Sequence, residues 1–162
     1  TPLLSCQEIA AEIQRSLDFL TTSLRDLPER QRSLRAVFDH SWRLLATEEQ
    51  RVLSQLSIFR GGFERSAGRA VAGADLNALL ALTSKSLVRR KESGRYDLHE
   101  VVRQYALSHL MQTAEYTETC NRHSRFYLAM LDGCEPALRS GAQRQTLRSL
   151  VEEIDNLRAA WE

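Results

Sequence analysis

The sequence has 162 residues, enough to bury a core and to form one domain or two small ones. Its 22 basic and 21 acidic residues leave a formal net charge of +1, which gives no general argument for binding nucleic acid or membrane. No apolar run approaches the roughly 20 residues that cross a bilayer, and no signal peptide is visible. Three cysteines without disulfide-type spacing are typical of a reducing compartment, so we expect a cytoplasmic protein.

Apolar residues at helical spacing, with few Gly and Pro between them, predict a mainly α-helical chain. We expect its first helices at about residues 5–20, 30–45, 47–59, 64–71 and 75–84. Pro28 marks a domain boundary, Gly73 ends the fourth of these helices, and Asp75 caps the fifth.

A β-hairpin is predicted after these helices. Residues 86–91 and 95–98 alternate as strands do, and a tight turn at residues 92–94 joins them. An amphipathic helix then begins at His99. Helices followed by a hairpin and a further helix are the order of a winged helix-turn-helix.

The chain stays helical beyond residue 113. Gly133 and Pro136 are expected to interrupt the first helix of this region, and an apolar stripe from Leu147 to Trp161 indicates further helix. If that stripe were exposed, it would favour self-association, so a homo-oligomer is one expectation.

Several titratable residues look structural. Cys120 and His123 share a helical face but lack the further ligands of a zinc site, so we predict no metal and core packing instead. Glu152 and Glu153 look like solvated surface charges and not like a catalytic pair. We predict no catalytic residues.

The seam between hairpin and helix, Leu98-His99-Glu100, has the best functional case. A helix N-terminus presents unpaired N–H groups and partial positive charge, which suit an anion. A histidine there can donate a hydrogen bond to a phosphate. The alternative is that His99 only caps the helix or packs beside it.

This stretch resembles the Met-His-Asp motif that closes the winged-helix domain of signal-transducing NTPases with numerous domains. This STAND class (NB-ARC-like AP-ATPases) includes many bacterial transcriptional regulators. In the class, the histidine contacts a nucleotide phosphate and helps to hold a closed, inactive state. Further stretches resemble the same winged helix, at residues 33–42, 56–63 and 85–88. Residues 122–127 and 153–158 resemble the linker and first helices of its tetratricopeptide-like (TPR-like) sensor arrays.

The resemblance implies three parts: residues 1–27 as the end of a helical subdomain, 28–112 as the winged-helix domain, and 113–162 as a linker and the start of a TPR-like sensor. The chain starts at Thr and ends within an apparent helix, so we expect a piece of a longer signalling ATPase. That parent would bind ADP or ATP.

The chain itself has no Gly-x-x-x-x-Gly-Lys-Ser/Thr phosphate loop, so we expect no enzyme activity and no cofactor of its own. Its role would be autoinhibitory, by intramolecular contact with a nucleotide-binding domain. His99 would reach the nucleotide phosphate only in the presence of that domain.

DNA binding is the rival hypothesis, because winged helices often bind DNA; a plain protein–protein scaffold is a third. The helix in the recognition position, about 75–84, has no Lys or Arg, although base and phosphate contacts favour them. DNA is therefore less favoured. The basic candidates lie at and after its end: Lys85, Arg89, Arg90, Lys91 and Arg95.

Overall fold

A computed structural model describes residues 37–138 and 143–161 of the chain. Its backbone contacts form two compact units, Thr1–Ala46 and Thr47–Glu162. In the first unit, residues 37–43 are helical, within the helix predicted over 30–45. The helix predicted over 5–20 and the boundary at Pro28 lie outside the described residues. The boundary predicted at residues 112 and 113 falls inside the second unit and stays a prediction.

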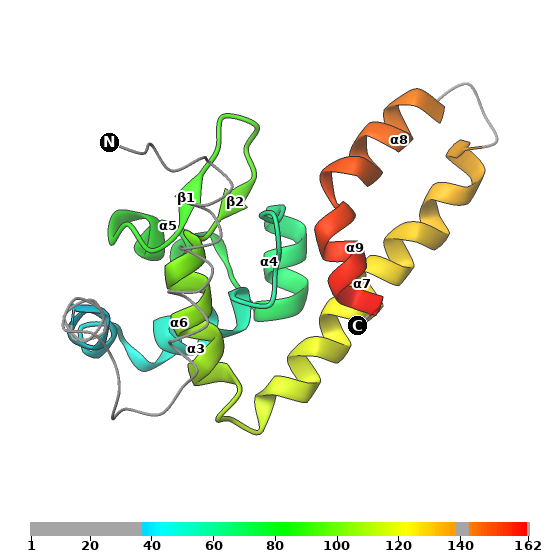
Figure 1. The fold of residues 1–162 in the computed structure, drawn as a ribbon. Helices are drawn as coiled ribbons and strands as arrows, with labels where there is room; N and C mark the ends of the chain where they lie inside the picture. The colour runs from blue at the N-terminus through cyan, green and yellow to red at the C-terminus, as the bar shows by residue number, and fades with distance from the viewer. Residues whose placement is uncertain (1–36, 139–142, 162) are drawn as a thin grey trace, which may run out of the picture. The chain divides into compact units, whose positions relative to one another are not determined.

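The second unit begins with three helices, α3 (Thr47–Leu56), α4 (Arg65–Ala72) and α5 (Leu76–Ser84) (Figure 1). Local signals set their ends. Gly73 ends α4 in the left-handed region, at φ 62°. The Asp75 side chain accepts the Ala78 N–H at 2.7 Å and caps α5. Both predictions are confirmed.

The hairpin is short. Strands β1 (Arg89–Arg90) and β2 (Tyr96–Asp97) pair antiparallel, and the Gly94 N–H closes the turn onto the Lys91 carbonyl at 2.9 Å. Phe63, from the loop after α3, pairs with Tyr96 through two backbone hydrogen bonds of 2.8 Å. The loop between α3 and α4 therefore lies directly against the hairpin.

Four helices complete the unit: α6 (Glu100–Leu110), α7 (Glu115–Leu138), α8 (Gln143–Glu152) and α9 (Ile154–Trp161). The expected interruption of α7 is wrong, since the helix runs through Gly133 and Pro136 to Leu138. A single helical Gly costs only about 1 kcal/mol, and Pro136 lies in the last turn, where few hydrogen bonds follow it. The apolar stripe from Leu147 to Trp161 is divided between α8 and α9.

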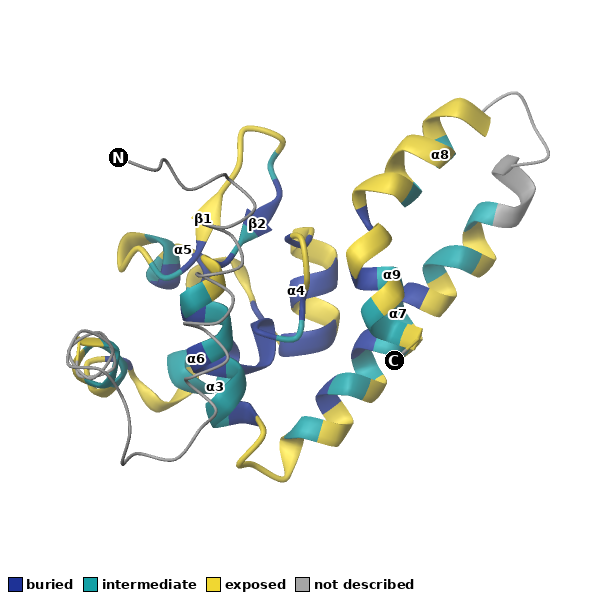
Figure 2. Cartoon of the chain, in the orientation of Figure 1, coloured by how far each residue is buried: buried dark blue, intermediate teal, exposed yellow. Residues whose placement is uncertain are grey.

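The structure is thus mainly helical, with one two-stranded sheet in its described part. Helix α3 packs against α4 and α6, and each of the three helices has a buried face (Figure 2). The Phe59 and Phe63 rings, which follow α3, stack with their centroids 4.6 Å apart. Figure 2 also shows α8 as mostly exposed, and none of its described residues is buried. Of the described helices, none has the length and apolar character needed to cross a bilayer.

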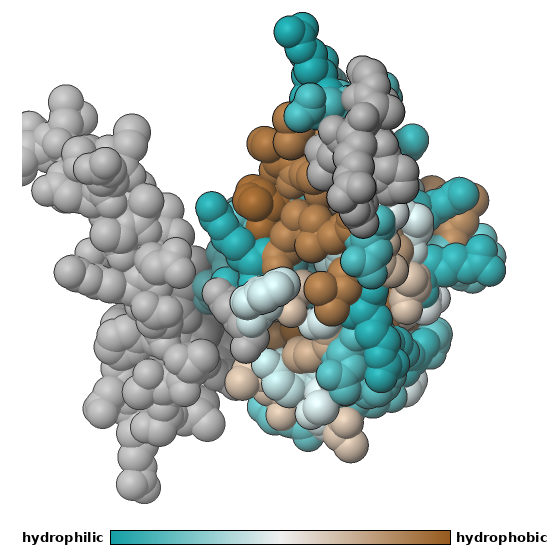
Figure 3. Space-filling view, turned by 90° about the vertical axis from the view of Figure 1, so that its right-hand side faces the viewer, coloured by the Kyte–Doolittle hydropathy of each residue, from teal (hydrophilic) through white to brown (hydrophobic). Residues whose placement is uncertain are grey.

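Apolar side chains remain on the outside of the last helices. Figure 3 shows hydrophobic surface gathered on the side of the molecule that carries them, with hydrophilic surface around it. The exposed large apolar residues of this region are Leu128, Leu147, Val151, Ile154 and Trp161. The self-association that such a surface would favour stays a prediction.

Candidate functional site

His99 is the residue immediately before α6 and occupies its N-cap position. Its Nδ1 accepts the Val101 N–H at 3.4 Å, and the residue is exposed. An Nδ1 that accepts a hydrogen bond carries no proton, so the neutral ring holds its proton on Nε2. The exposed histidine can therefore cap the helix with one nitrogen and donate from the other.

Glu100, the first residue of α6, is held by side chains one turn further along the helix. Arg103 donates to it at 2.6 and 2.8 Å, and Gln104 donates at 2.9 Å. The hydrogen bonds from Arg103, supported by Gln104 and opposed by partial burial, lower the pKa of Glu100. The carboxylate is thus stabilised within the helix and keeps Arg103 in a fixed orientation.

The basic residues near the hairpin are mostly paired with acidic ones. Lys85 contacts Glu49 at 2.6 Å, and Asp97 lies 3.5 Å from Arg89 and 3.3 Å from Lys91. Arg90 is exposed. These pairs reduce the positive field that a basic wing would offer to DNA.

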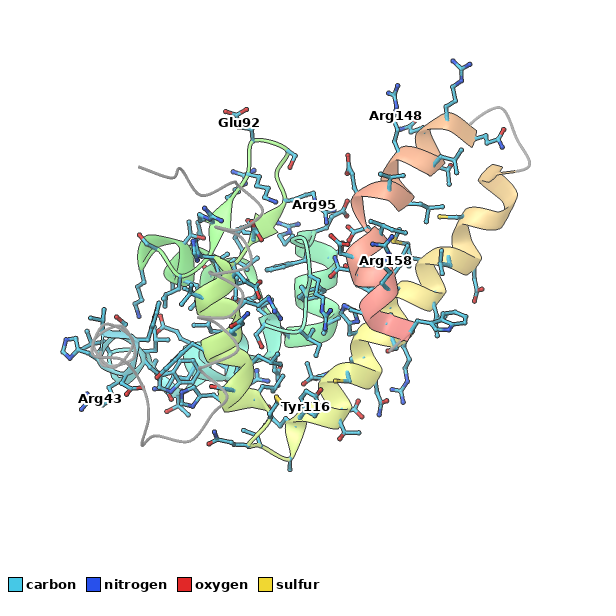
Figure 4. The ribbon with its side chains drawn as sticks, in the orientation of Figure 1. Arg43, Glu92, Arg95, Tyr116, Arg148 and Arg158 are labelled. Atoms are coloured by element: carbon cyan, nitrogen blue, oxygen red, sulfur yellow. The ribbon has the colours of Figure 1, made fainter. Side chains whose placement is uncertain are left out.

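Arg95 does not lie on the exposed surface of the hairpin. It is 8% exposed and forms an ion pair with Glu153, which comes between α8 and α9. Figure 4 shows Arg95 lying between the hairpin and α9. The prediction that Arg95 belongs to a DNA-binding surface is therefore wrong, because its guanidinium is buried against a carboxylate 58 residues away.

Glu153 is the centre of a buried polar cluster that we call the junction: Gly62, Arg95, Tyr127, Glu153 and Asn156. Besides Arg95, its carboxylate accepts the Tyr127 hydroxyl at 3.0 Å and the Asn156 side-chain amide at 2.8 Å. Glu153 is only 5% exposed. The prediction of a solvated surface charge is wrong for this residue, while Glu152 is exposed as expected.

The Gly61-Gly62 turn supplies backbone groups to the junction. The Gly62 carbonyl accepts the Asn156 amide at 2.7 Å and Arg95 at 3.3 Å, while the Asn156 side-chain oxygen accepts the Arg60 N–H at 2.7 Å. At φ 94°, Gly62 has a conformation that L-residues rarely adopt. A Cβ at this position would lie 2.8 Å from the Tyr96 carbonyl oxygen. Only glycine lets this turn approach the hairpin so closely.

The junction perturbs the titration of its members. The hydrogen bond to Glu153 raises the pKa of Arg95. Burial, together with the charge and the hydrogen bond of Glu153, raises the pKa of Tyr127. The cluster therefore holds one buried ion pair and one neutral phenol near neutral pH. Such pairs are strongly sensitive to the loss of either charge.

The junction connects three regions that are distant in sequence: the turn after α3, the hairpin, and the α7–α9 helices. Its central residue, Glu153, is not predicted from the sequence as a functional residue, although residues 122–127 and 153–158 carry a family resemblance. One available signal was the spacing of Glu153 and Asn156, since residues three apart share a helical face. In the described part of the chain, no cluster of three or more His, Cys, Asp or Glu side chains could hold a metal ion.

The surface of α5 is apolar where a recognition helix would meet DNA. Leu76 and Leu80 are 47% and 57% exposed. Asn77 and Ser84 are also exposed, but the helix itself carries no basic side chain. Such a face suits contact with protein better than contact with phosphates.

Comparison with known proteins gives matches in sequence and in structure. No known protein family matches the chain by its sequence profile. Proteins of Mycobacterium tuberculosis (strain H37Rv) and Mycobacterium bovis named "Putative HTH-type transcriptional regulator" are each 37% identical to it over 168 residues. The alignment covers 98% of this chain but 19% of each relative, so the chain spans about a fifth of their length.

The fold is similar to that of a solved STAND protein with a tetratricopeptide repeat sensor, from Pyrococcus horikoshii. The TM-score is 0.51 at 23% identity, over 85% of this chain and 22% of that protein. This likeness concerns the fold alone. It supports the mainly helical architecture seen here.

Proposed function

We propose that this chain is the autoinhibitory, nucleotide-state-sensing region of a STAND-type signalling ATPase. In this proposal, α3 to α6 with the hairpin form a winged helix, and α7 to α9 begin a TPR-like sensor. The winged helix contacts a nucleotide-binding domain in the same protein and holds the inactive state. Release of that contact permits nucleotide exchange.

The observation that carries the proposal is the position of His99. It lies at the N-terminus of an eleven-residue helix, exposed, with its capping nitrogen turned to the backbone and Nε2–H available as a donor. The resemblance of Leu98-His99-Glu100 to the STAND motif suggests that the group accepting this hydrogen bond is a nucleotide phosphate. The likeness to the solved STAND protein concerns the fold alone and agrees with the helical architecture of this proposal.

The α5 surface supports an intramolecular contact. Exposed Leu76 and Leu80 offer an apolar patch next to the hairpin, and such patches on helices commonly meet other protein surfaces. The ion-paired wing adds little positive potential to attract nucleic acid.

The test is substitution of His99 in the full-length protein. Loss of one hydrogen bond to a charged phosphate costs about 1.5–3 kcal/mol, or roughly 10- to 150-fold in ADP affinity. We expect His99→Ala to speed ADP release and raise basal ATPase activity accordingly. His40→Ala is the matched control, since His40 is also exposed but lies outside the seam.

A second variant separates the phosphate contact from helix capping. Asn is a good N-cap residue, so His99→Asn preserves the cap but shortens the side chain. We call the inhibitory contact between His99 and the nucleotide phosphate the latch. Faster ADP release from both His99 variants supports the latch, whereas normal release from His99→Asn indicates that His99 only caps the helix. The 162-residue chain alone should bind ADP only weakly, and a sub-micromolar affinity by calorimetry would contradict an incomplete site.

DNA binding is the second candidate, favoured by the names of the mycobacterial relatives. Because this chain spans about a fifth of those proteins, the helix-turn-helix for which they are named can lie in another part of them. A duplex mobility shift by the 162-residue chain tests the candidate. Specific DNA binding should weaken steeply with salt and weaken further on Arg90→Gln.

A further inference from the structure

A cavity of about 330 Å³ lies within the second unit, between its first half, from α3 to α6, and its second half, from α7 to α9. One side is formed by the turn after α3 and by α6, and the other by α7 and α9. Its volume is at the lower end of the range of small-molecule sites in proteins. His99 is not among its lining residues, so the cavity is separate from the seam described above.

Two guanidinium groups line the cavity, and one of them, that of Arg103, is paired with Glu100 outside it. Arg60 and Arg103 both line it, and none of the described lining residues is acidic. Arg103 is oriented by its bonds to Glu100 and by a 3.3 Å bond to the Ser57 carbonyl. A fixed arginine retains further donors for a carboxylate or phosphate and loses little entropy on binding it.

His123 lies in the wall of the cavity with an unsatisfied nitrogen. The residue is 1% exposed, yet its Nε2 has no hydrogen-bond partner among the described residues. Burial lowers the pKa of His123 to about 4, and the charge of Arg60 adds to this effect against Asn156 and Glu153. The ring is thus neutral near pH 7. A buried polar atom without a partner is unfavourable, so a ligand that satisfies it gains affinity.

The remaining walls are apolar or weakly polar. Ile58, Leu107 and Ala160 provide the apolar surface. Cys120 also lines the cavity and is half-buried. A ligand here would meet two guanidinium groups, one unsatisfied imidazole nitrogen and a hydrocarbon wall.

We propose that this cavity binds a small hydroxylated organic anion. Its carboxylate or phosphate lies between Arg60 and Arg103, and a hydroxyl meets Nε2 of His123, since a hydroxyl can both donate and accept. Its carbon skeleton packs against Leu107. Because the walls belong to both halves of the unit, the bound anion bridges them and stabilises their present arrangement.

Cys120 provides the readout. In a Cys6→Ser, Cys134→Ser background it is the single remaining cysteine, and its alkylation by iodoacetamide can be followed by mass spectrometry. The probes are gluconate for the carboxylate source and glucose 6-phosphate for the phosphate source. Glucose and sodium chloride, at matched concentration and ionic strength, are the controls.

We expect at least one of the two anions to slow the alkylation of Cys120 saturably, several-fold at high concentration, while glucose and chloride do not. Gluconate alone would identify a carboxylate ligand and glucose 6-phosphate alone a phosphate. Arg60→Gln, at an exposed position, should abolish the protection. Arg69→Gln, at an exposed position of α4, makes the same charge change outside the cavity and should keep the protection.

The proposal is overturned if neither anion protects Cys120, if glucose protects it equally, or if Arg60→Gln leaves the protection intact. Calorimetry with the protecting anion gives an independent check on the same variants. Nucleotide and the nucleotide-binding domain take no part in the assay. A negative result therefore leaves the proposed latch untouched, and a failed latch leaves this site untouched.

Discussion

Glu153→Gln tests whether the junction holds the second unit together. The substitution preserves shape but removes the charge that pairs with buried Arg95. It also replaces one acceptor oxygen with a donor, which then faces Arg95 on one side or the Asn156 amide on the other. The variant thus leaves a buried cation unpaired and brings two donors together.

Breaking a buried ion pair from one side costs about 3–5 kcal/mol. Both side chains are almost fully buried, at 10% and 7% exposure, so solvent screening does not reduce this value much. With a urea slope of about 2 kcal/mol/M, the unfolding midpoint should fall by about 2 M. Urea denaturation of the 162-residue chain, followed by far-ultraviolet circular dichroism, measures the shift.

Glu152→Gln is the matched control, because it makes the same chemical change at an exposed neighbouring residue. Its free energy of unfolding should stay within about 0.5 kcal/mol of that of the parent. Adding Arg95→Met to Glu153→Gln removes the orphaned cation and should recover part of the loss. A stabilising role for the Arg95–Glu153 pair is contradicted if Glu153→Gln and Glu152→Gln unfold at the same urea concentration, or if the double variant is the least stable of all.

Three further predictions concern single residues. Gly62→Ala should lower the melting temperature more than Gly94→Ala. Both glycines have a positive φ, but only a Cβ at position 62 would meet another atom, the Tyr96 carbonyl oxygen at 2.8 Å. Equal changes in melting temperature would contradict this clash. The His123 pKa of about 4 lies below the unfolded value of 6.5, so the unfolded state binds more protons between these values and stability falls as pH drops through that window, by about 3 kcal/mol in total. His123→Phe should flatten the slope of unfolding free energy against pH between these two values. An unchanged slope would mean that other groups cause the pH dependence. Asp75→Ala should cost about 1 kcal/mol in urea unfolding while Asp75→Asn retains the cap, so similar losses in both would argue against capping.

Features set by neighbouring residues were predictable from the sequence. The cap at Asp75, the left-handed Gly73, the turn at Gly94 and the start of α6 after His99 each depend on a few adjacent residues. Local rules suffice there because the backbone groups that need partners find them within one turn of helix.

The junction was not predictable in the same way. Arg95 and Glu153 look like surface charges, since charged side chains are seldom buried unless paired, and their pairing spans 58 residues. The continuation of α7 through Pro136 likewise differs from the local expectation. For His99, the position before the helix and two alternative roles were predictable, and the structure adds the capping bond of Nδ1.

The Gly62 carbonyl is a main-chain acceptor that binds two side-chain donors, and this difference has an evolutionary consequence. The oxygen accepts one hydrogen bond from Arg95 and one from Asn156, so both of its lone pairs are used. As a main-chain atom, it is present whatever amino acid a codon change introduces. Genetic drift can therefore erode the contact only through its two donors or by displacing the turn. Changes at Arg95 and Asn156 should accordingly occur together in related sequences more often than either occurs alone.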